Sequence, residues 1–397
     1  METREERGVE IARSGKVRAG RENQWLVPSQ SGCGTWVVDY GGGEPTCTCP
    51  DYEKRAAFCK HIFCVEIIRR RGITVTNNRK SYGQAWSNYN QAQVNEGDHF
   101  VYLLHDLCKG LEEEPQEGRG RRRTPLADVV FALVMKVYVG KSGRRAATWI
   151  KRCHKDGFLS KPVSYNTISD SFRRADLTPL LRDLVQQTAL PLRGLEREFA
   201  IDSSGIGSRT YDRWFDEKWG QHKRRAKFRT AHIIVGTHTH CVTDVIVSDE
   251  GDTTQFQPLL ERTVARFQVD EVSADKAYSS KKNHQVAADL GVTPFIKFKA
   301  GTRGDNGPDE WRKMYHYYQF KEADFLAHYH RRSNVETVFG MVKAKFGAFV
   351  SSKNKTAQVN EVYAKFICHN ICVLIASIYE LKLVPQFWTE AADTEVA

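Results

Sequence analysis

The spacing of apolar residues changes character along the chain. Between residues 125 and 195, segments such as LADVVFALVMKVYVG and RRAATWIKRCHKDG carry apolar residues at helical intervals, which predicts a series of amphipathic helices. Pro125 suits the first position of a helix, Gly140 suits its end, and Ser164 suits the cap of the segment SYNTISDSFRRADL. This arrangement resembles a helix-turn-helix DNA reader, although a plain helical bundle has the same pattern.

After this helical region the pattern becomes one of strands and helices. EFAIDSSG predicts an apolar strand that ends in Asp202, and AHIIVGTH and CVTDVIVSDE alternate as paired antiparallel strands do. A helix capped by Asp252 and a strand ending at Asp275 follow. One long helix is expected from Trp311 to Phe346, and a last apolar helix from Glu361 to Leu381. This order of elements predicts an α/β domain.

The N-terminal part has a different composition. It is rich in Gly, Cys and β-forming residues, with WLVPSQ and GTWVVDY typical of short strands and CKHIFCVEIIRRR typical of a helix. The acidic and then basic run KGLEEEPQEGRGRRR is typical of a solvated linker. The division that we predict is a small module at 1–72, a spacer and linker at 73–124, the helical region at 125–195, the α/β domain at 196–385 and a tail at 386–397.

Composition narrows the class of protein. The chain has 397 residues, 41% of them hydrophobic, and a formal charge of +11, which favours a polyanionic partner. The start METREERGVE does not look like a signal peptide, and the apolar run ICVLIASIY is too short to span a bilayer. We therefore expect a protein of the cell interior without a membrane partner. Its ten cysteines are then expected to be metal ligands or buried thiols, such as those of the run CHNIC.

Two closely spaced pairs of residues predict a zinc site. Cys47 and Cys49 form a C-x-C pair, and Cys59 and His61 form a C-x-H pair nine residues later. Four such ligands suit a tetrahedral structural Zn²⁺, and a small Gly-rich module needs that support. The segment from about residue 15 to 70 resembles the SWIM zinc finger, and the resemblance maps the zinc ligands onto these four residues. Cys64 is expected in the core of the following helix, with ligation as the alternative.

Three acidic residues are candidates for a second metal site. Cleavage of a phosphodiester needs an activated nucleophile and a stabilised leaving oxygen, and two divalent cations about 4 Å apart supply both. Asp202 and Asp275 follow predicted strands and Glu336 lies in a predicted helix, so they could form such a first shell. Taken singly, each is more often a helix cap or an ion-pair partner.

The segment around Glu336 is more specific. Tyr329, Arg332, Glu336 and Lys343 follow one another at offsets of 3, 4 and 7, which brings them near one face of a helix. This Tyr-x2-Arg-x3-Glu-x6-Lys spacing, with AIDSSG and ADKAY upstream, resembles the signature of DDE-class insertion-sequence transposases. The resemblance runs from about residue 121 to 383.

The resemblance implies a fold, a reaction and a set of roles. It implies a ribonuclease H-like catalytic domain with a mixed sheet, in which Asp202, Asp275 and Glu336 hold two Mg²⁺, with Mn²⁺ able to substitute. Tyr329 and the two basic residues of the signature, Arg332 and Lys343, would contact DNA phosphates. The reaction would free a 3′-hydroxyl at a transposon end and join it to target DNA.

The resemblance also implies a setting. It implies double-stranded DNA as the partner, a homodimer on DNA, and a bacterial or archaeal cytoplasm with association to the nucleoid. Lys227 and His232 fall where such enzymes often carry a Lys and a His near the site.

Three other functions stay open. A catalytically silent DNA-binding derivative of a transposase would share the fold, although it has no chemical need for three acidic residues. A nuclease that cuts without joining would use the same metal site. A zinc-finger adaptor would leave most of the chain unexplained.

Overall fold

The computed structural model describes residues 3–13, 17–21, 23–30, 34–70, 85–116, 118–120, 122–208, 228–299, 301–304 and 306–388. By internal contacts the chain divides into two compact units, Met1–Gln84 and Ala85–Ala397. We describe each unit by itself.

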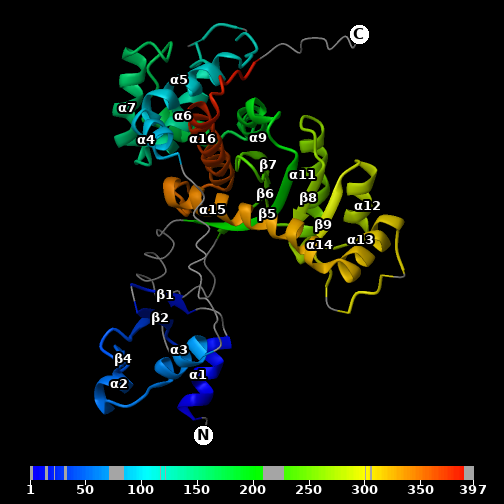
Figure 1. Ribbon diagram of the computed structural model, residues 1–397. Helices are drawn as coiled ribbons and strands as arrows, with labels where there is room; N and C mark the ends of the chain where they lie inside the picture. The colour runs from blue at the N-terminus through cyan, green and yellow to red at the C-terminus, as the bar shows by residue number, and fades with distance from the viewer. Residues whose placement is uncertain are drawn as a thin grey trace, which may run out of the picture. The chain divides into compact units, whose positions relative to one another are not determined.

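The first unit is a small antiparallel sheet with helices packed against it (Figure 1). Both predicted strands and the predicted helix are present in it. Helices α1 and α3 approach so closely that a Cβ added to Gly8 would lie 2.8 Å from the Cβ of Phe63. The core contains Val27, Val38 and Ile62, together with the cysteines of the predicted zinc site. Its elements are α1 (Arg4–Arg13), β1 (Arg18–Ala19), β2 (Gln24–Pro28), β3 (Thr35–Asp39), β4 (Thr46–Cys47), α2 (Pro50–Arg55) and α3 (Lys60–Arg70).

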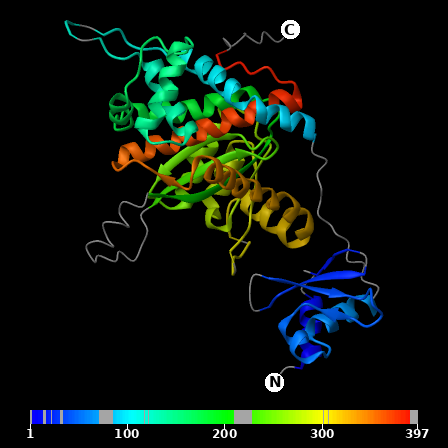
Figure 2. The ribbon, with the colours of Figure 1, turned by 90° about the vertical axis from the view of Figure 1, so that its left-hand side faces the viewer.

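The second unit is a mixed sheet covered by helices (Figures 1 and 2). The strand order is β7-β6-β5-β8-β9, and β10 pairs in parallel with the far end of β5. Strand β5 is antiparallel to β6 and parallel to β8. The strands are β5 (Glu198–Ser208), β6 (Phe228–Gly236), β7 (Val242–Ser248), β8 (Glu271–Ala274), β9 (Thr293–Ile296) and β10 (Phe349–Val350).

The helices of this unit come from both ends of its sequence. The N-terminal ones are α4 (Trp86–Val94), α5 (Glu96–Lys109), α6 (Leu126–Val139), α7 (Gly143–Lys155), α8 (Tyr165–Phe172), α9 (Leu177–Ala189) and the short η1 (Leu190–Leu192). The later ones are α11 (Asp252–Val264), η2 (Lys276–Tyr278), α12 (Lys281–Asp289), α13 (Asp309–Phe320), α14 (Glu322–Tyr329), η3 (His330–Arg332), α15 (Ser333–Phe346) and α16 (Lys355–Leu381).

Helix α16 is the central helix of the second unit. It contacts α4, α5, α6, α8 and α9 on one side and the sheet on the other, so the helical region and the sheet share one hydrophobic core. By length and composition α16 could cross a membrane, but 78% of its most apolar window is buried inside the protein. Packing therefore accounts for its apolar character. The CHNIC cysteines lie on this helix, with Cys368 fully buried.

The predicted caps of the helical region are close to those observed. Ser164 accepts a hydrogen bond from the amide of Thr167, and Gly140 ends α6 with a φ of 67°. Pro125 is the residue before α6 rather than its first residue, and Asp252 is the first residue of α11 rather than its cap. Each of these two differences is a single residue.

Three expectations about the α/β domain were wrong. Strand β5 does not end at Asp202 but continues to Ser208, because its pairing with β6 runs on as far as Gly207 and Phe228. The long helix from 311 to 346 is interrupted at Lys321, whose φ of −133° is not helical, and again by the tighter turn η3. The last helix begins at Lys355 rather than Glu361, because the Asn354 side chain caps the amide of Ala357.

Candidate zinc site and acidic site

The four predicted zinc ligands lie together in the first unit. The donor atoms of Cys47, Cys49, Cys59 and His61 are all within 4.8 Å of one another, and all four residues are buried. The Nδ1 atom of His61 is 3.8 Å from the sulfur of Cys47 and 3.8 Å from that of Cys59. A tetrahedral zinc with Zn–S of about 2.3 Å and Zn–N of about 2.0 Å needs similar separations of roughly 3.5 Å. The cluster therefore fits Zn²⁺, with Nδ1 as the histidine ligand.

The local fold explains why these ligands meet. Cys47 ends β4, Cys49 directly precedes α2, and Cys59 and His61 lie at the start of α3. The thiols of Cys47 and Cys59 share a hydrogen bond that lowers the pKa of Cys59 and raises the pKa of Cys47, so one thiolate is already favoured. Zinc binds thiolates, so the lowered pKa of Cys59 favours ligation by that sulfur, whereas Cys47 and Cys49 would lose their protons when zinc binds.

Cys64 is not part of the ligand cluster. It lies on α3 with no exposed surface, and burial raises the pKa of its thiol to about 12. It belongs to the hydrophobic core of the first unit, as the sequence pattern predicts, and the alternative of ligation is not supported by its position.

In the second unit, one predicted acidic residue lies on β5 and another directly follows the adjacent parallel strand β8. Ile201 of β5 pairs with Ala274, the last residue of β8, so the residues that come next, Asp202 and Asp275, lie at the same level of the sheet. The Asp202 side chain is 20% exposed and accepts a hydrogen bond of 2.8 Å from the amide of Ser203. Burial raises the pKa of Asp202, and the negative charge of Asp275 adds to this, while Ser203 and Arg332 oppose it.

Arg332 connects the third acidic residue to the first. One guanidinium nitrogen donates to Asp202 at 2.7 Å, and another donates to Glu336 at 2.8 Å. Glu336 lies in the first turn of α15, and its side chain is 60% exposed. Burial alone would lower the pKa of Arg332, but the carboxylates of Asp202 and Glu336 raise it, so this residue stays charged.

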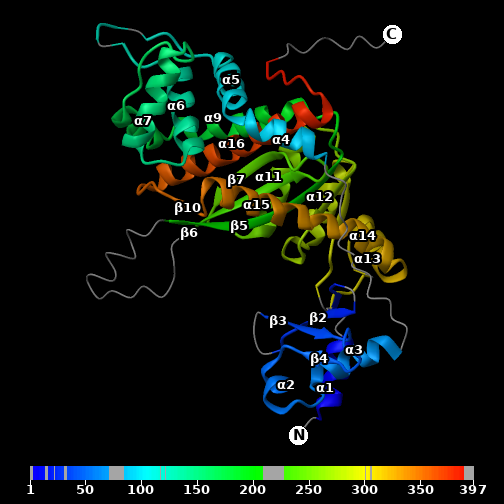
Figure 3. The same ribbon diagram turned by 60° about the vertical axis from the view of Figure 1, so that its left-hand side comes forward.

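The other two signature residues also face β5 and β8. The Tyr329 hydroxyl donates to Asp275 at 3.4 Å, and the Lys343 ammonium donates to the Ser204 hydroxyl at 2.7 Å. The interruption at η3 does not separate the signature residues, because α14, η3 and α15 follow one another across the same part of the sheet (Figure 3).

The acidic residues are more widely spaced than the zinc ligands. Among the described residues, only the cysteine and histidine cluster brings three or more donor atoms within 4.8 Å of one another. Two cations separated by about 3.5 to 4 Å do not need all three carboxylates at one point.

His232 lies on the other face of the sheet. It pairs with Ser203, and directly paired residues share a face while consecutive residues alternate. Asp202 contacts Arg332 of η3 and Ser204 contacts Lys343 of α15, whereas the Nδ1 of His232 lies 3.3 Å from Asp252 of α11. Burial lowers the pKa of His232, which keeps the ring neutral. Lys227 lies outside the described residues.

Two residues of this region had no signal in the sequence. Ser204 holds Lys343 in place, and a serine in a strand is not distinctive. Tyr278 is fully buried after β8, and its hydroxyl has no hydrogen-bond partner among the described residues. Burial raises its pKa, and the charges of Asp252 and Asp202 add to this effect. Tyr278 is the tyrosine of the ADKAY motif, and the sequence did not indicate that it would be buried.

The fold and the site together define a class. A mixed sheet with carboxylates on adjacent central strands and a third on a later helix is the ribonuclease H-like arrangement. Residues 193–371 match the family model described as transposase DDE domain, and residues 36–65 match the SWIM zinc finger. The second unit thus carries a transposase DDE domain and the first a SWIM zinc finger. The family makes DNA the expected partner.

Proposed function

We propose that this protein is an active DNA transposase in which Asp202, Asp275 and Glu336 hold two Mg²⁺. The observation that carries the proposal is the placement of Asp202 beside Asp275 on adjacent strands, with Arg332 drawing Glu336 toward them. When bound, the two ions would activate the attacking oxygen and stabilise the leaving oxygen. The reaction would be hydrolysis at a transposon end, followed by attack of the freed 3′-hydroxyl on target DNA.

The remaining signature residues would bind and orient the DNA backbone. Arg332 is the counter-ion of Asp202 and Glu336, and once cations neutralise these carboxylates its guanidinium is free to bind a phosphate in a bidentate manner. Lys343 lies about 10 Å further along α15 than Glu336, given 1.5 Å per residue, and would hold a neighbouring phosphate. The Tyr329 hydroxyl, which donates to Asp275, would position a phosphate beside that carboxylate.

The other parts of the chain would support this reaction. We assign residues 1–72 as a zinc-stabilised module that adds a DNA or protein contact, 73–124 as a connecting segment, 125–195 as a DNA-binding helical region, 196–385 as the catalytic domain and 386–397 as a tail. The protein would act as a homodimer on two DNA ends in a bacterial or archaeal cytoplasm.

The proposal is tested by cleavage of a duplex that carries the element's own ends. Wild type is compared with Asp202→Asn and Glu336→Gln, which keep side-chain size and remove charge, with Mg²⁺, Mn²⁺ or EDTA. We expect cleavage by wild type with either metal, none with EDTA, and a loss of at least a thousandfold in both variants with DNA affinity retained. Binding by wild type without cleavage in either metal would instead favour a silent DNA-binding derivative.

A further inference from the structure

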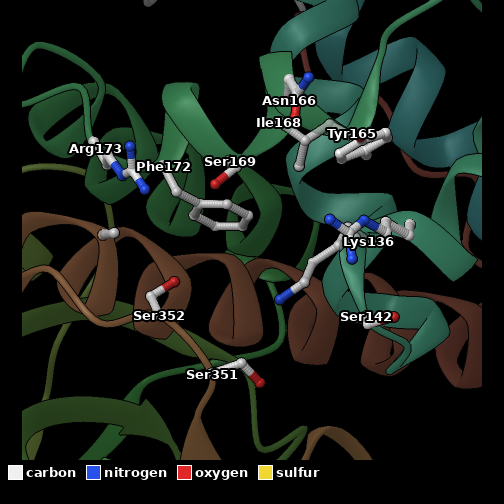
Figure 4. A pocket seen from close by; sticks show the side chains of 13 residues that line it. Lys136, Ser142, Tyr165, Asn166, Ile168, Ser169, Phe172, Arg173, Ser351 and Ser352 are labelled. Atoms are coloured by element: carbon white, nitrogen blue, oxygen red, sulfur yellow. The ribbon is translucent and has the colours of Figure 1, made fainter.

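A polar pocket lies in the second unit, away from the acidic site. Its volume is about 440 Å³, and it is formed by α6, the start of α7, α8 and the segment that follows β10 (Figure 4). Three basic residues, Lys136, Arg144 and Arg173, line it, and no acidic residue does. Ser351 and Ser352 form the side nearest to the sheet.

The base of the pocket is held firmly. Glu361 of α16 is buried and accepts hydrogen bonds from the amides of Ser351 and Ser352, at 3.0 and 2.9 Å. The same carboxylate lies 3.4 Å from the ammonium of Lys136, which also lies over the ring of Phe172. Burial alone would raise the pKa of Glu361, but Lys136 and these hydrogen bonds lower it, so its charge offsets that of Lys136.

Two arginines give the pocket its remaining positive charge. Arg144 is exposed and lies over the ring of Tyr165, with its guanidinium carbon 5.5 Å from the ring centroid. Arg173 pairs with Asp170 at 3.4 Å, but both side chains are more than 60% exposed, so water screens this pair strongly. Both guanidinium groups are therefore available to an anion that enters the pocket.

The start of α7 adds amide donors to these charges. Ser142 and Gly143 line the pocket, and the Ser142 side chain makes no capping hydrogen bond. The N-terminus of this 13-residue helix therefore forms part of the pocket wall, and its cap residue provides no side-chain acceptor for the first amides. Helix N-termini of this kind bind phosphate oxygens, and arginines beside them strengthen the binding.

The pocket lies in line with the acidic site along β5. Val350 pairs with Ser208, which lies six residues beyond Asp202 on β5. At 3.3 Å per residue, the segment that starts at Ser351 therefore lies about 20 Å from Asp202. Lys343 contacts Ser204 between these two points. Duplex DNA rises 3.4 Å per base pair, so the separation corresponds to about six base pairs.

We propose that this pocket binds one backbone phosphate of the DNA, about six base pairs from the phosphate that is cut. The position relative to the cut rests on the proposed transposase function, whereas phosphate binding itself does not. The ligand chemistry is a phosphate anion that contacts Arg144, Arg173 and the first amides of α7. The pocket would fix the register of the DNA on the protein, so that the scissile phosphate reaches Asp202.

Binding of end-containing duplex is measured by fluorescence anisotropy over a range of salt concentrations, without added Mg²⁺ or Mn²⁺ so that cleavage does not interfere. Arg144→Gln with Arg173→Gln is compared with Arg197→Gln, which removes an arginine that is 59% exposed, pairs with Asp270 and lies just before β5, at the end of that strand away from the pocket. We expect the double variant to lose about 0.9 from the slope of log affinity against log salt, the value for one phosphate. At 0.1 M salt it should bind about tenfold more weakly, and Arg197→Gln should bind as wild type does.

A set of duplexes with one neutral methylphosphonate each locates the contact. We expect the substitution about six base pairs from the cut to weaken binding by wild type and to leave the double variant unaffected. Equal salt slopes for wild type and the double variant would overturn the proposal. The thermal stabilisation of wild type and the double variant by inorganic phosphate is also compared. If the double variant loses this stabilisation but binds DNA as wild type does, the proposal is overturned and the pocket is a site for a free anion. Cleavage is scored separately, so an inactive wild type would refute only the proposed function.

Discussion

Arg332 should stabilise the metal-free protein at the acidic site and become less important for stability when metal is bound. In the metal-free structure it is the cation that contacts both Asp202 and Glu336. Arg332→Gln keeps much of the side-chain length and removes the charge. The contact with Asp202 joins two side chains that are 22% and 20% exposed, and a charge-assisted hydrogen bond in such a setting contributes about 2 kcal/mol. The contact with Glu336 is more exposed and contributes less than about 0.5 kcal/mol.

The melting temperature should report this loss directly. For a unit of this size, about 2 kcal/mol corresponds to a decrease of roughly 4 °C in Tm. We expect that decrease for Arg332→Gln at low salt in the absence of Mg²⁺. With 10 mM Mg²⁺ the difference in Tm from wild type should fall to about half, because the bound cations then neutralise the carboxylates in place of the missing guanidinium. Circular dichroism at 222 nm with and without metal measures both values.

A neighbouring arginine provides the matched control. Arg331 contacts Glu198 and Glu271 rather than the acidic triad. Arg331→Gln should therefore lower Tm by a similar amount that Mg²⁺ does not restore. A melting temperature of Arg332→Gln within 1 °C of wild type without Mg²⁺ would refute this prediction, and so would equal restoration of both variants by Mg²⁺.

Three further outcomes are expected. Cys59→Ser or a strong chelator should unfold the first unit, because zinc binding contributes on the order of 10 kcal/mol to its folding. Cys64→Ala should keep one zinc per chain, which atomic emission measures. Lys343→Gln should reduce the salt slope of DNA binding by about 0.9 without changing Tm by more than 1 °C in the absence of DNA. Burial lowers the pKa of both His284 and His369 to about 4, so below pH 6.5 the unfolded chain binds more protons at these positions. The free energy of unfolding should then be highest above pH 6.5 and fall by roughly 2 kcal/mol per histidine by pH 5, which urea titration measures; constant stability over this range would contradict the assignment.

The elements with strong local signals were predictable from the sequence. The apolar alternation of EFAI and EVSA marks β5 and β8, and the cysteine and histidine pairs mark the zinc site before any fold is known. The offsets of the signature predicted which side chains face the acidic site, even though η3 interrupts the helix.

Features that depend on distant parts of the chain were not predictable. The continuation of β5 to Ser208 depends on pairing with β6, which extends as far as Gly207 and Phe228. The segment SSGIGS at the end of β5 has no strand pattern of its own. The shared core of the helical region and the sheet arises because α16, near the C-terminus, packs against helices from residue 86 onward. The face on which His232 lies follows from strand register, which the sequence alone does not define.

The central claim is that this acidic site performs strand transfer. The most direct test gives the protein pre-cut transposon ends and a supercoiled plasmid, in Mg²⁺, with either a 3′-hydroxyl or a 3′-deoxy terminus on the end that joins. The account predicts joined product only with the 3′-hydroxyl, and none with Asp202→Asn. Nicking of the plasmid by wild type without joined product, on ends that it binds, would contradict the account and leave a metal-dependent nuclease.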